Sequence, residues 1–494
     1  DLRVVGHKSV ALAAQNFSSS TQAYNTAVGH NAGALITTVI RNTLIGGLAG
    51  DALQDADFNV GVGYGALSAD TLGSGSVAIG DFTLVNQNFT SATTTYNTAV
   101  GYAAGSSVTT GTHNTIIGGL AGDAMTTALR NTSVGYSSLG GLTTGNDNLA
   151  LGYNALFSAT TSAYNTAVGS GSLQVTTTGG YNVGVGFRTL WTNITGASNT
   201  ALGYSALRNS TASNNTAVGY NALTANTTGQ YNISMGSESL EANTTGNFNV
   251  GLGYAALEAN TTAANNTAVG AYALLRNTTG TGNSAVGYLA LDANTTGNAN
   301  SAFGGEWTSN ASAALSGNTT GARNSAFGTG ALAQNTTASY NTAMGYKSLY
   351  ANTTSSNNTA VGYEAGAAVT TGTGNTFVGA LAGDATDDGG YNTAVGAGAL
   401  GANCASGNVA IGEVALRDCT GSNQTAIGQN AGLTATSGLN NTFLGRDAGR
   451  TGSPGGAITT QSNIVVIGDE AITAANIQVD WTVASDARDK TDFT

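Results

Sequence analysis

The sequence holds little charge, almost no proline and few aromatic side chains. Charged residues make up 8% and aromatic residues 7% of its 494 positions, and Pro454 is the only proline. One proline, without a glycine at every third position, excludes collagen. No run of about 20 apolar residues is present, so no membrane-spanning helix is expected. Disorder is excluded too, because disordered chains combine low hydrophobicity with high charge, whereas 41% of this chain is hydrophobic.

What the sequence does have is glycine, at 72 positions, in a repeat that runs from end to end. The phrase Asn-Thr-Ala-Val-Gly and its variants close on 27 glycines, from Gly6 to Gly468. Of the 26 intervals between these glycines, 19 are 17 residues and three are 16, while four insertions stretch the interval to between 21 and 24. Such a period indicates a stack of similar structural units.

Each position of the repeat admits few residue types. The residue before the glycine is large and apolar in all 27 repeats, which predicts a buried aliphatic site. The third residue after the glycine is Ala, Ser or Thr in 26 repeats, which predicts a confined site. The residue four before the glycine is Asn in 23 repeats, the departures being Leu2, Ser76, Gln424 and Ile464.

The repeat predicts an all-β fold. Glycine, Asn and β-branched Thr and Val oppose helix formation, and the Asn-Thr-Ala-Val-Gly segment suits a short strand. Stacking these strands gives a parallel β-solenoid, or β-roll, of about 27 coils over residues 1–468, shaped as an elongated rod. Asn25, Asn42 and Asn59 would then lie over one another as a hydrogen-bonded ladder. The alternative is that these asparagines only form turns.

A coil of 17 residues has a thin core, with room for about one Val and one Leu per turn. The strands carry two apolar faces, one of Val and one of Ala (Ala27, Ala99, Ala167 and Ala217). One face would line the coil and the other would pack against a neighbour. We therefore expect a homo-oligomer, with a trimer as the closed form, and a lone solenoid as the alternative.

Two resemblances support this interpretation. Asn97–Ala104 and the stretch Ser76-Val77-Ala78-Ile79-Gly80 resemble the repeats of trimeric autotransporter adhesin heads. Those heads are left-handed parallel β-rolls that form trimers, so the resemblance implies the same class of fold and assembly. The period here is a few residues longer, in the Asn-Thr-Thr-Gly turn, and the chain does not end in a membrane-anchor segment.

The stretch Trp-Thr-Val-Ala-Ser-Asp-Ala-Arg-Asp-Lys-Thr-Asp, from Trp481 to Asp492, resembles the start of an endosialidase-type intramolecular chaperone domain. Such domains end phage tail fibres and tailspikes, drive trimer assembly and then cleave themselves off. The resemblance implies a cut before Ser485, with Ser485 as the nucleophile and Lys490 as its base. Residues 485–494 would begin the chaperone, residues 469–484 would form the tip, and the chain would be part of a longer one.

The insertions and a few isolated residues are the candidate contact sites. The insertions carry Phe82, Phe89, Glu306 and Trp307, whose side chains suit contact with a glycan or receptor, although spacer or cap loops are the alternative. Cys404 and Cys419 would lie on adjacent coils, as a disulfide or as reduced thiols. Asn-x-Thr sequons would be glycan acceptors only on a secreted cellular filament; they are Asn226, Asn243, Asn260, Asn277, Asn294, Asn335 and Asn352.

Groups for other chemistry are scarce. His7, His30 and His113 form no metal-binding pattern, and Asp51, Asp123 and Asp384 would lie on distant coils. Nucleophile elbows, phosphate loops and paired-Cys motifs are lacking, and a net charge of −12 opposes nucleic-acid binding. No cofactor, metal, nucleic acid or membrane insertion is expected.

The sequence thus predicts a structural and adhesive protein, the trimeric shaft of a bacteriophage tail fibre that helps attach the virion to a host-cell glycan or receptor. Apart from the single self-cleavage, no enzyme activity is expected, and a glycan-degrading tailspike is the weaker reading because no carboxylate pair is fixed. The alternative is a cellular trimeric adhesin or a secreted extracellular filament. The location would be the virion or the extracellular space.

Overall fold

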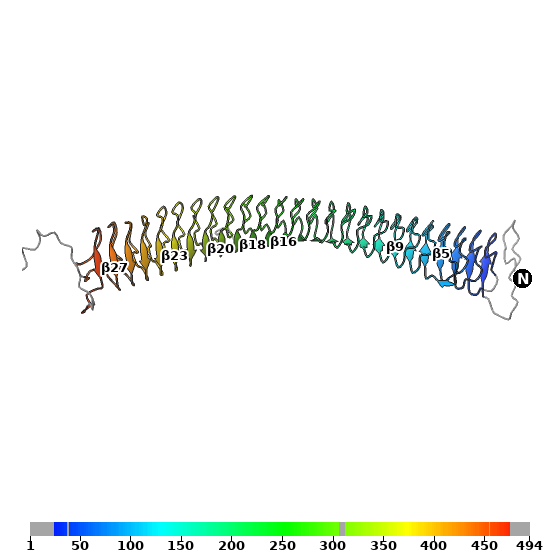
Figure 1. Cartoon of the computed structure of the whole chain (residues 1–494), viewed down its shortest axis with the longest axis horizontal. Coiled ribbons are helices and arrows are strands. Elements are labelled where there is room, and N and C mark those ends of the chain that lie inside the picture. The colour runs from blue at the N-terminus through cyan, green and yellow to red at the C-terminus, as the bar shows by residue number, and fades with distance from the viewer. Residues whose placement is uncertain (1–23, 37–38, 306–311, 454, 475–494) are drawn as a thin grey trace, which may run out of the picture. The chain divides into compact units, whose positions relative to one another are not determined.

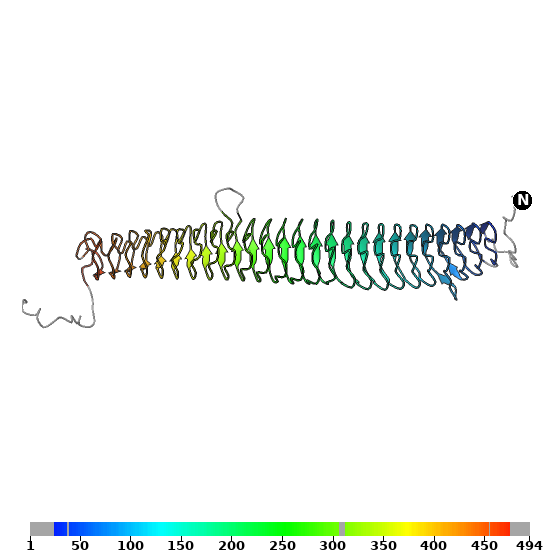
Figure 2. The ribbon, with the colours of Figure 1, turned by 90° about the horizontal axis from the view of Figure 1, so that it is seen from above.

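The computed structural model describes residues 24–36, 39–305, 312–453 and 455–474. These residues fall into two compact units, within residues 1–339 and residues 340–494. Each unit is a stack of coils, elongated along the stacking direction, and the described residues of both contain strands and turns but no helix (Figures 1 and 2). The predicted all-β parallel β-solenoid is therefore confirmed.

In the first unit, eighteen three-residue strands lie side by side, one from each coil, and two shorter strands form a separate pair. The eighteen are β1 (Thr26–Val28), β2 (Thr43–Ile45), β3 (Val60–Val62), β5 (Val77–Ile79), β7 (Thr98–Val100), β8 (Thr115–Ile117), β9 (Thr132–Val134), β10 (Leu149–Leu151), β11 (Thr166–Val168), β12 (Val183–Val185), β13 (Thr200–Leu202), β14 (Thr216–Val218), β15 (Ile233–Met235), β16 (Val250–Leu252), β17 (Thr267–Val269), β18 (Ser284–Val286), β19 (Ser301–Phe303) and β20 (Ser325–Phe327). The separate parallel pair is β4 (Gly73–Ser74) with β6 (Thr93–Thr94).

The second unit has eight strands of the same kind: β21 (Thr342–Met344), β22 (Thr359–Val361), β23 (Thr376–Val378), β24 (Thr393–Val395), β25 (Val409–Ile411), β26 (Thr425–Ile427), β27 (Thr442–Leu444) and β28 (Val465–Ile467). In both units each strand pairs in parallel with the strand of the next coil, as Thr166 does with Val183 one period later. The structure thus describes 26 of the 27 predicted repeats, since the repeat around Gly6 lies outside the described residues.

The glycine that follows each strand is required by the stacking of the coils. Gly219 has a φ of 139°, a value that side chains with a Cβ rarely adopt. A Cβ added there would lie 2.5 Å from the carbonyl oxygen of Gly236 in the next coil, which is closer than van der Waals contact allows. The same geometry recurs along both units, and it explains why this position accepts glycine alone.

The residue before that glycine is on the outside of the coil, so the prediction of a buried aliphatic site there is wrong. The central residue of every three-residue strand is buried, whereas the first and third residues are partly or fully exposed, as in β1, β15 and β23. The Ala face therefore lines the core. The reason is space, because a coil of 17 residues brings its opposite walls too close together for a Val at every central position.

The predicted asparagine ladder exists, directly before the strands. In this strand ladder Asn131 Oδ1 accepts the backbone N–H of Asn148 at 3.0 Å and its side-chain amide at 3.1 Å. Asn148 Nδ2 also donates to the carbonyl oxygen of Ser162, at 2.9 Å. The Asn148 side chain thus joins neighbouring coils, and its buried polar atoms are satisfied. The interpretation of these asparagines as turn formers only is therefore wrong.

In the described coils from Gly29 to Gly445, the third residue after the glycine is buried and small, as predicted, apart from Trp307, which lies outside the described residues; the fourth is a buried Leu in most of these coils. Four strands carry Leu, Ile or Phe as the central residue, and there the fourth position is Gly in two successive coils; β28 carries Val466 without such a pair. Phe377 is the clearest case, because Cβ atoms added at Gly366 and Gly383 would lie 2.8 and 2.6 Å from its ring. The other three sets are Leu44 with Gly33 and Gly50, Ile116 with Gly105 and Gly122, and Phe443 with Gly432 and Gly449.

Candidate functional site

The surface that the fold leaves without a partner is the outer face of the strands, defined here as the first and third residue of each three-residue strand. The third residue is Val, Ile, Leu, Met or Phe in all 26 described strands, and no first or third residue is charged. Its side chain is partly to well exposed, from the half-buried Val168 to 47% exposed in Met235. This position stays apolar in every described strand, and an apolar row that continues over many coils is typical of a protein–protein contact.

The outer face is large enough to drive association. Burying one aliphatic side chain completely contributes about 1.5–3 kcal/mol, so covering the exposed third or so of one such residue contributes roughly 0.5–1 kcal/mol. Eighteen coils of the first unit would give about 9–18 kcal/mol by this estimate. Association of two proteins costs about 4–15 kcal/mol, which the face of this unit is large enough to offset.

Exposed aromatic side chains stand at both ends of the strands. One set follows the strand-closing glycine, where Tyr136 and Tyr153 stack with ring centroids 5.8 Å apart. The other set lies two residues before the strand, where Tyr164 and Tyr181 stack at 4.9 Å. The rings are spaced by about one coil, so they cover the backbone of the turns and border the outer face.

Of the predicted contact residues, Phe82 fits its role and Phe89 does not. Phe82 is 40% exposed and makes edge contacts with Tyr64 and Tyr102, so it belongs to the exposed aromatic set. Phe89 is 5% exposed, because its insertion folds back onto the coil, and it cannot be a surface contact. Glu306 and Trp307 lie outside the described residues.

A second ladder of asparagines runs through the Asn-Thr-Thr turns. In this turn ladder Asn243 Nδ2 donates to Asn226 Oδ1 at 2.9 Å, and Asn260 Nδ2 donates to Asn243 Oδ1 at 2.8 Å. Every member is buried. The members are Asn226, Asn243, Asn260, Asn277, Asn294, Asn318 and Asn335.

The strand ladder is interrupted at Ser76, and a buried polar cluster fills the gap. Gln87 Nε2 donates to Asp70 Oδ2 at 2.6 Å and to Ser76 Oγ at 2.9 Å, while Gln87 Oε1 accepts from Asn97 Nδ2 at 2.8 Å. Burial raises the pKa of Asp70, against the opposing effect of its hydrogen bonds from Gln87 and Gly73. The cluster carries the hydrogen bonding across the missing asparagine, so its role is structural.

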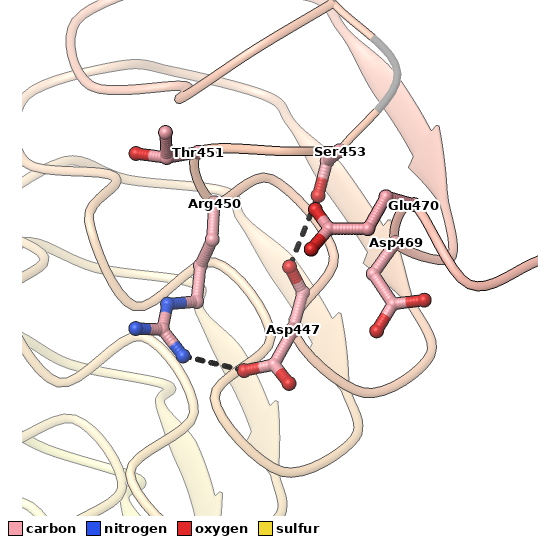
Figure 3. A pocket seen from close by; sticks show the side chains of 6 residues that line it. All are labelled: Asp447, Arg450, Thr451, Ser453, Asp469 and Glu470. Carbon is pink, nitrogen blue, oxygen red and sulfur yellow. Dashed lines mark hydrogen bonds and ion pairs between the residues drawn. The ribbon is translucent and has the colours of Figure 1, made fainter.

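A shallow pocket lies in the second unit, at the insertion before β28 (Figure 3). Asp447 projects into it and pairs with Arg450 at 2.5 Å and with Arg446 at 3.0 Å, and the hydrogen bond from Arg450 is the main cause that lowers the pKa of Asp447. Asp469 and Glu470 line the other side. No group of three or more His, Cys, Asp or Glu side chains within the described residues could hold a metal ion.

Cys404 and Cys419 are buried free thiols on adjacent coils, as the spacing predicted. Cys404 Sγ donates to the carbonyl oxygen of Cys419 at 3.1 Å, and Gln424 Nε2 donates to Cys419 Sγ at 3.2 Å. The hydrogen bond between the two thiols raises the pKa of Cys404 and lowers that of Cys419. Their oxidation to a disulfide stays a prediction.

The predicted cleavage residues Ser485 and Lys490, with the proposed tip beyond residue 474, lie outside the described residues, as does His7. His113 packs its ring against Tyr96 at 5.4 Å. Among the described residues no helix is long and apolar enough to cross a membrane.

No protein-family model matches this chain, and no curated protein is similar enough to match it. The candidate site therefore rests on its own geometry.

Sequence reasoning predicted an apolar strand face directed at a neighbour but placed the residue before the glycine in the core, and it missed the turn ladder, although both features left a signal. The third strand residue stays apolar while the positions around it change, and the turn asparagine recurs at one offset through successive coils. The polar cluster at Asp70 left only the break at Ser76.

Proposed function

We propose that this chain is the structural shaft of a bacteriophage tail fibre, which assembles from three copies of itself and contributes to attachment to a host surface. The observation that carries the proposal is the outer face, which is uncharged in all 26 described strands and has an apolar third residue in each of them. A fibre needs a stiff repeating body, and the coils provide one through ladders and stacked backbone. Copies packed on the outer face would bury the surface that a single coil cannot cover.

The attachment role is supported by the exposed aromatic side chains, which remain at the borders of the outer face after such packing. Tyr and Phe present large rigid surfaces to glycans and proteins at a low entropy cost. The viral assignment is supported by the resemblance of Trp481–Asp492 to the start of a self-cleaving chaperone domain.

The assembly is tested by native mass spectrometry of the purified chain. We expect a trimer, and we expect the triple variant Leu151→Lys, Leu202→Lys and Met235→Lys to be monomeric with an unchanged circular dichroism spectrum. Replacement of Tyr231, which is half exposed two residues before β15, by Lys is the control and should leave the trimer intact. A monomeric wild-type chain would overturn the proposed assembly.

The viral assignment is tested by self-cleavage. The protein expressed from its complete gene and its Ser485→Ala variant are incubated and sized on a denaturing gel. We expect the wild type to release a C-terminal fragment and the variant to stay whole, because the serine hydroxyl would be the nucleophile. The same uncut band from both proteins counts against the chaperone assignment.

A further inference from the structure

Each asparagine of the turn ladder begins the sequence Asn-Thr-Thr. This is also an acceptor sequence for N-linked glycans, which is normally found on exposed loops. All seven sequons considered for glycosylation have a fully buried asparagine. Six of them, Asn226, Asn243, Asn260, Asn277, Asn294 and Asn335, belong to the turn ladder, and Asn352 occupies the equivalent position in the second unit.

Both hydrogens of the side-chain amide of each turn-ladder asparagine are used in hydrogen bonds. Asn243 Nδ2 donates one hydrogen to Asn226 Oδ1 at 2.9 Å and the other to the carbonyl oxygen of Gly246 at 3.1 Å. Asn260 repeats this with Asn243 Oδ1 at 2.8 Å and the carbonyl oxygen of Ala263 at 3.1 Å. A primary amide has two N–H donors, and here both are used.

N-glycosylation would remove one of these donors. In that reaction the amide nitrogen bonds to the anomeric carbon of a lipid-diphosphate oligosaccharide, the bond from that carbon to the phosphate oxygen breaks, and the nitrogen loses one proton. The sugar would then occupy the core, where Gly246 is already so close that an added Cβ would lie 2.5 Å from Asn243 Oδ1. The modification would therefore remove a hydrogen bond, and the coil has no room for the sugar.

We infer that the native coil and a glycan on a turn-ladder asparagine exclude each other: a modified chain cannot close these coils, and a closed coil cannot be modified. The inference holds whether or not the chain is a tail fibre. It has a consequence for biogenesis, because a chain that meets oligosaccharyl transfer before it folds would be prevented from folding at six or more successive positions. The chain is therefore suited to folding in a compartment without that reaction.

The chain supplies its own control sequons. Asn214, Asn265 and Asn357 also begin Asn-x-Thr sequences, but they lie two residues before a strand with exposed side chains. Asn265 has a φ of 60° and no place in either ladder. These residues could carry a glycan without entering the core.

The test is expression of the chain with a secretory leader in eukaryotic cells, with a flexible Asn-Gly-Thr tag that reports transfer. Limited proteolysis separates the folded fraction from the unfolded fraction. Enzymatic removal of the glycans then marks every modified asparagine by conversion to Asp, which peptide mass spectrometry detects. We expect marks on the turn-ladder asparagines in the protease-sensitive fraction alone, and marks on the tag or on Asn265 in either fraction. A mark at Asn243 or Asn260 in the protease-resistant fraction would overturn the inference.

A matched variant tests the consequence. Replacing the third sequon residue by Val at Thr228, Thr245, Thr262, Thr279, Thr296, Thr320, Thr337 and Thr354 removes the seven acceptors and that of the ladder member Asn318, while leaving every ladder asparagine in place. These threonines are exposed. We expect the secreted variant to give at least a tenfold larger protease-resistant fraction than the secreted wild type, and both to give equal yields from the bacterial cytoplasm. Equal resistant fractions from the secreted proteins, with the wild type glycosylated at its ladder, would contradict the inference.

Discussion

The seventh position after each glycine is filled in two different ways within the first unit. Between residues 108 and 159 it holds the apolar side chains of Val108, Met125, Leu142 and Ala159, whereas from Asn226 to Asn335 it holds the turn ladder. Both fillings are fully buried, and the strands beside them pair in the same register. The backbone of the coil therefore keeps the same strand pairing with either kind of side chain at this position, provided that neighbouring coils carry the same kind.

This agreement between neighbours is what the difference teaches. An apolar side chain satisfies itself by contact with any apolar neighbour. An amide needs a donor on one side and an acceptor on the other, so each ladder asparagine depends on the coil before it and the coil after it. We therefore expect an amide side chain to destabilise the apolar region and an apolar side chain to destabilise the turn ladder.

The largest effect is expected from Met125→Asn, which places a single amide in the apolar region. The variant loses a fully buried side chain and leaves amide atoms facing Val108 and Leu142, which offer no hydrogen bond. We expect the local opening free energy to fall by about 4 kcal/mol. Hydrogen exchange followed by mass spectrometry on peptides of residues 98–150 measures it. Met125→Leu is the control, with a cost below about 1.5 kcal/mol; equal costs for both variants would contradict the distinction.

The reverse exchange, Asn260→Leu, should cost about 3 kcal/mol. It leaves the Oδ1 of Asn243 without its donor and the Nδ2 of Asn277 without its acceptor, at roughly 1–3 kcal/mol for each buried group. Hydrogen exchange across residues 240–290 gives the change.

The sharper form of this test replaces the ladder as a block. Asn226, Asn243, Asn260, Asn277 and Asn294 changed together to Leu should cost less per site than Asn260→Leu alone, because interior partners disappear together. A block cost of five times the single cost, or more, would show that the amides act separately and that neighbouring coils need not agree.

The smallest effect is expected from a change at Asp70, in the buried polar cluster. Because burial raises its folded pKa above the unfolded value of about 3.9, the folded state binds the proton more tightly. That stabilisation is complete below the unfolded pKa and is lost as the pH rises through the folded pKa. Asp70→Asn should therefore flatten the fall in stability above pH 4. Denaturant unfolding at a series of pH values measures it, and the exposed Asp55→Asn, as control, should keep the wild-type slope.

Most of the fold could be predicted from the sequence because its constraints are backbone constraints. A Cβ at Gly219 would meet the next coil, and Asn131 must satisfy buried groups of two coils, so both positions repeat without much variation. The assignment of faces could not be predicted in the same way. Ala and Val alternate on the strand, both are apolar, and hydrophobicity favours burying Val. Only the narrow interior decides for Ala, and the interior width depends on how the turns close.

The candidate site was predictable in part. The sequence predicted one apolar strand face against a neighbour, but the apolar position before the glycine was placed in the core, so that face was not assigned to the right residues. Phe89 was taken for a surface residue because it lies in an insertion, whereas its burial depends on how that insertion folds back. Asn226 was interpreted as a turn residue because Asn-Thr-Thr-Gly has ordinary turn composition, and the stacking of identical turns is a property of neighbouring coils.

The pairing of each strand with the next one has a consequence for how the chain acquires its structure. In the described strands, residues that pair are 16 or 17 positions apart, or 21 to 24 across an insertion, in a sequence of 494. The relative contact order is then about 0.03, below that of small helical bundles and far below the usual value for β proteins. At a synthesis rate of about 5–20 residues per second, each coil emerges within roughly 1–3 seconds. Each coil that has just left the ribosome can pair with the coil made before it, so the solenoid can fold one coil at a time during synthesis.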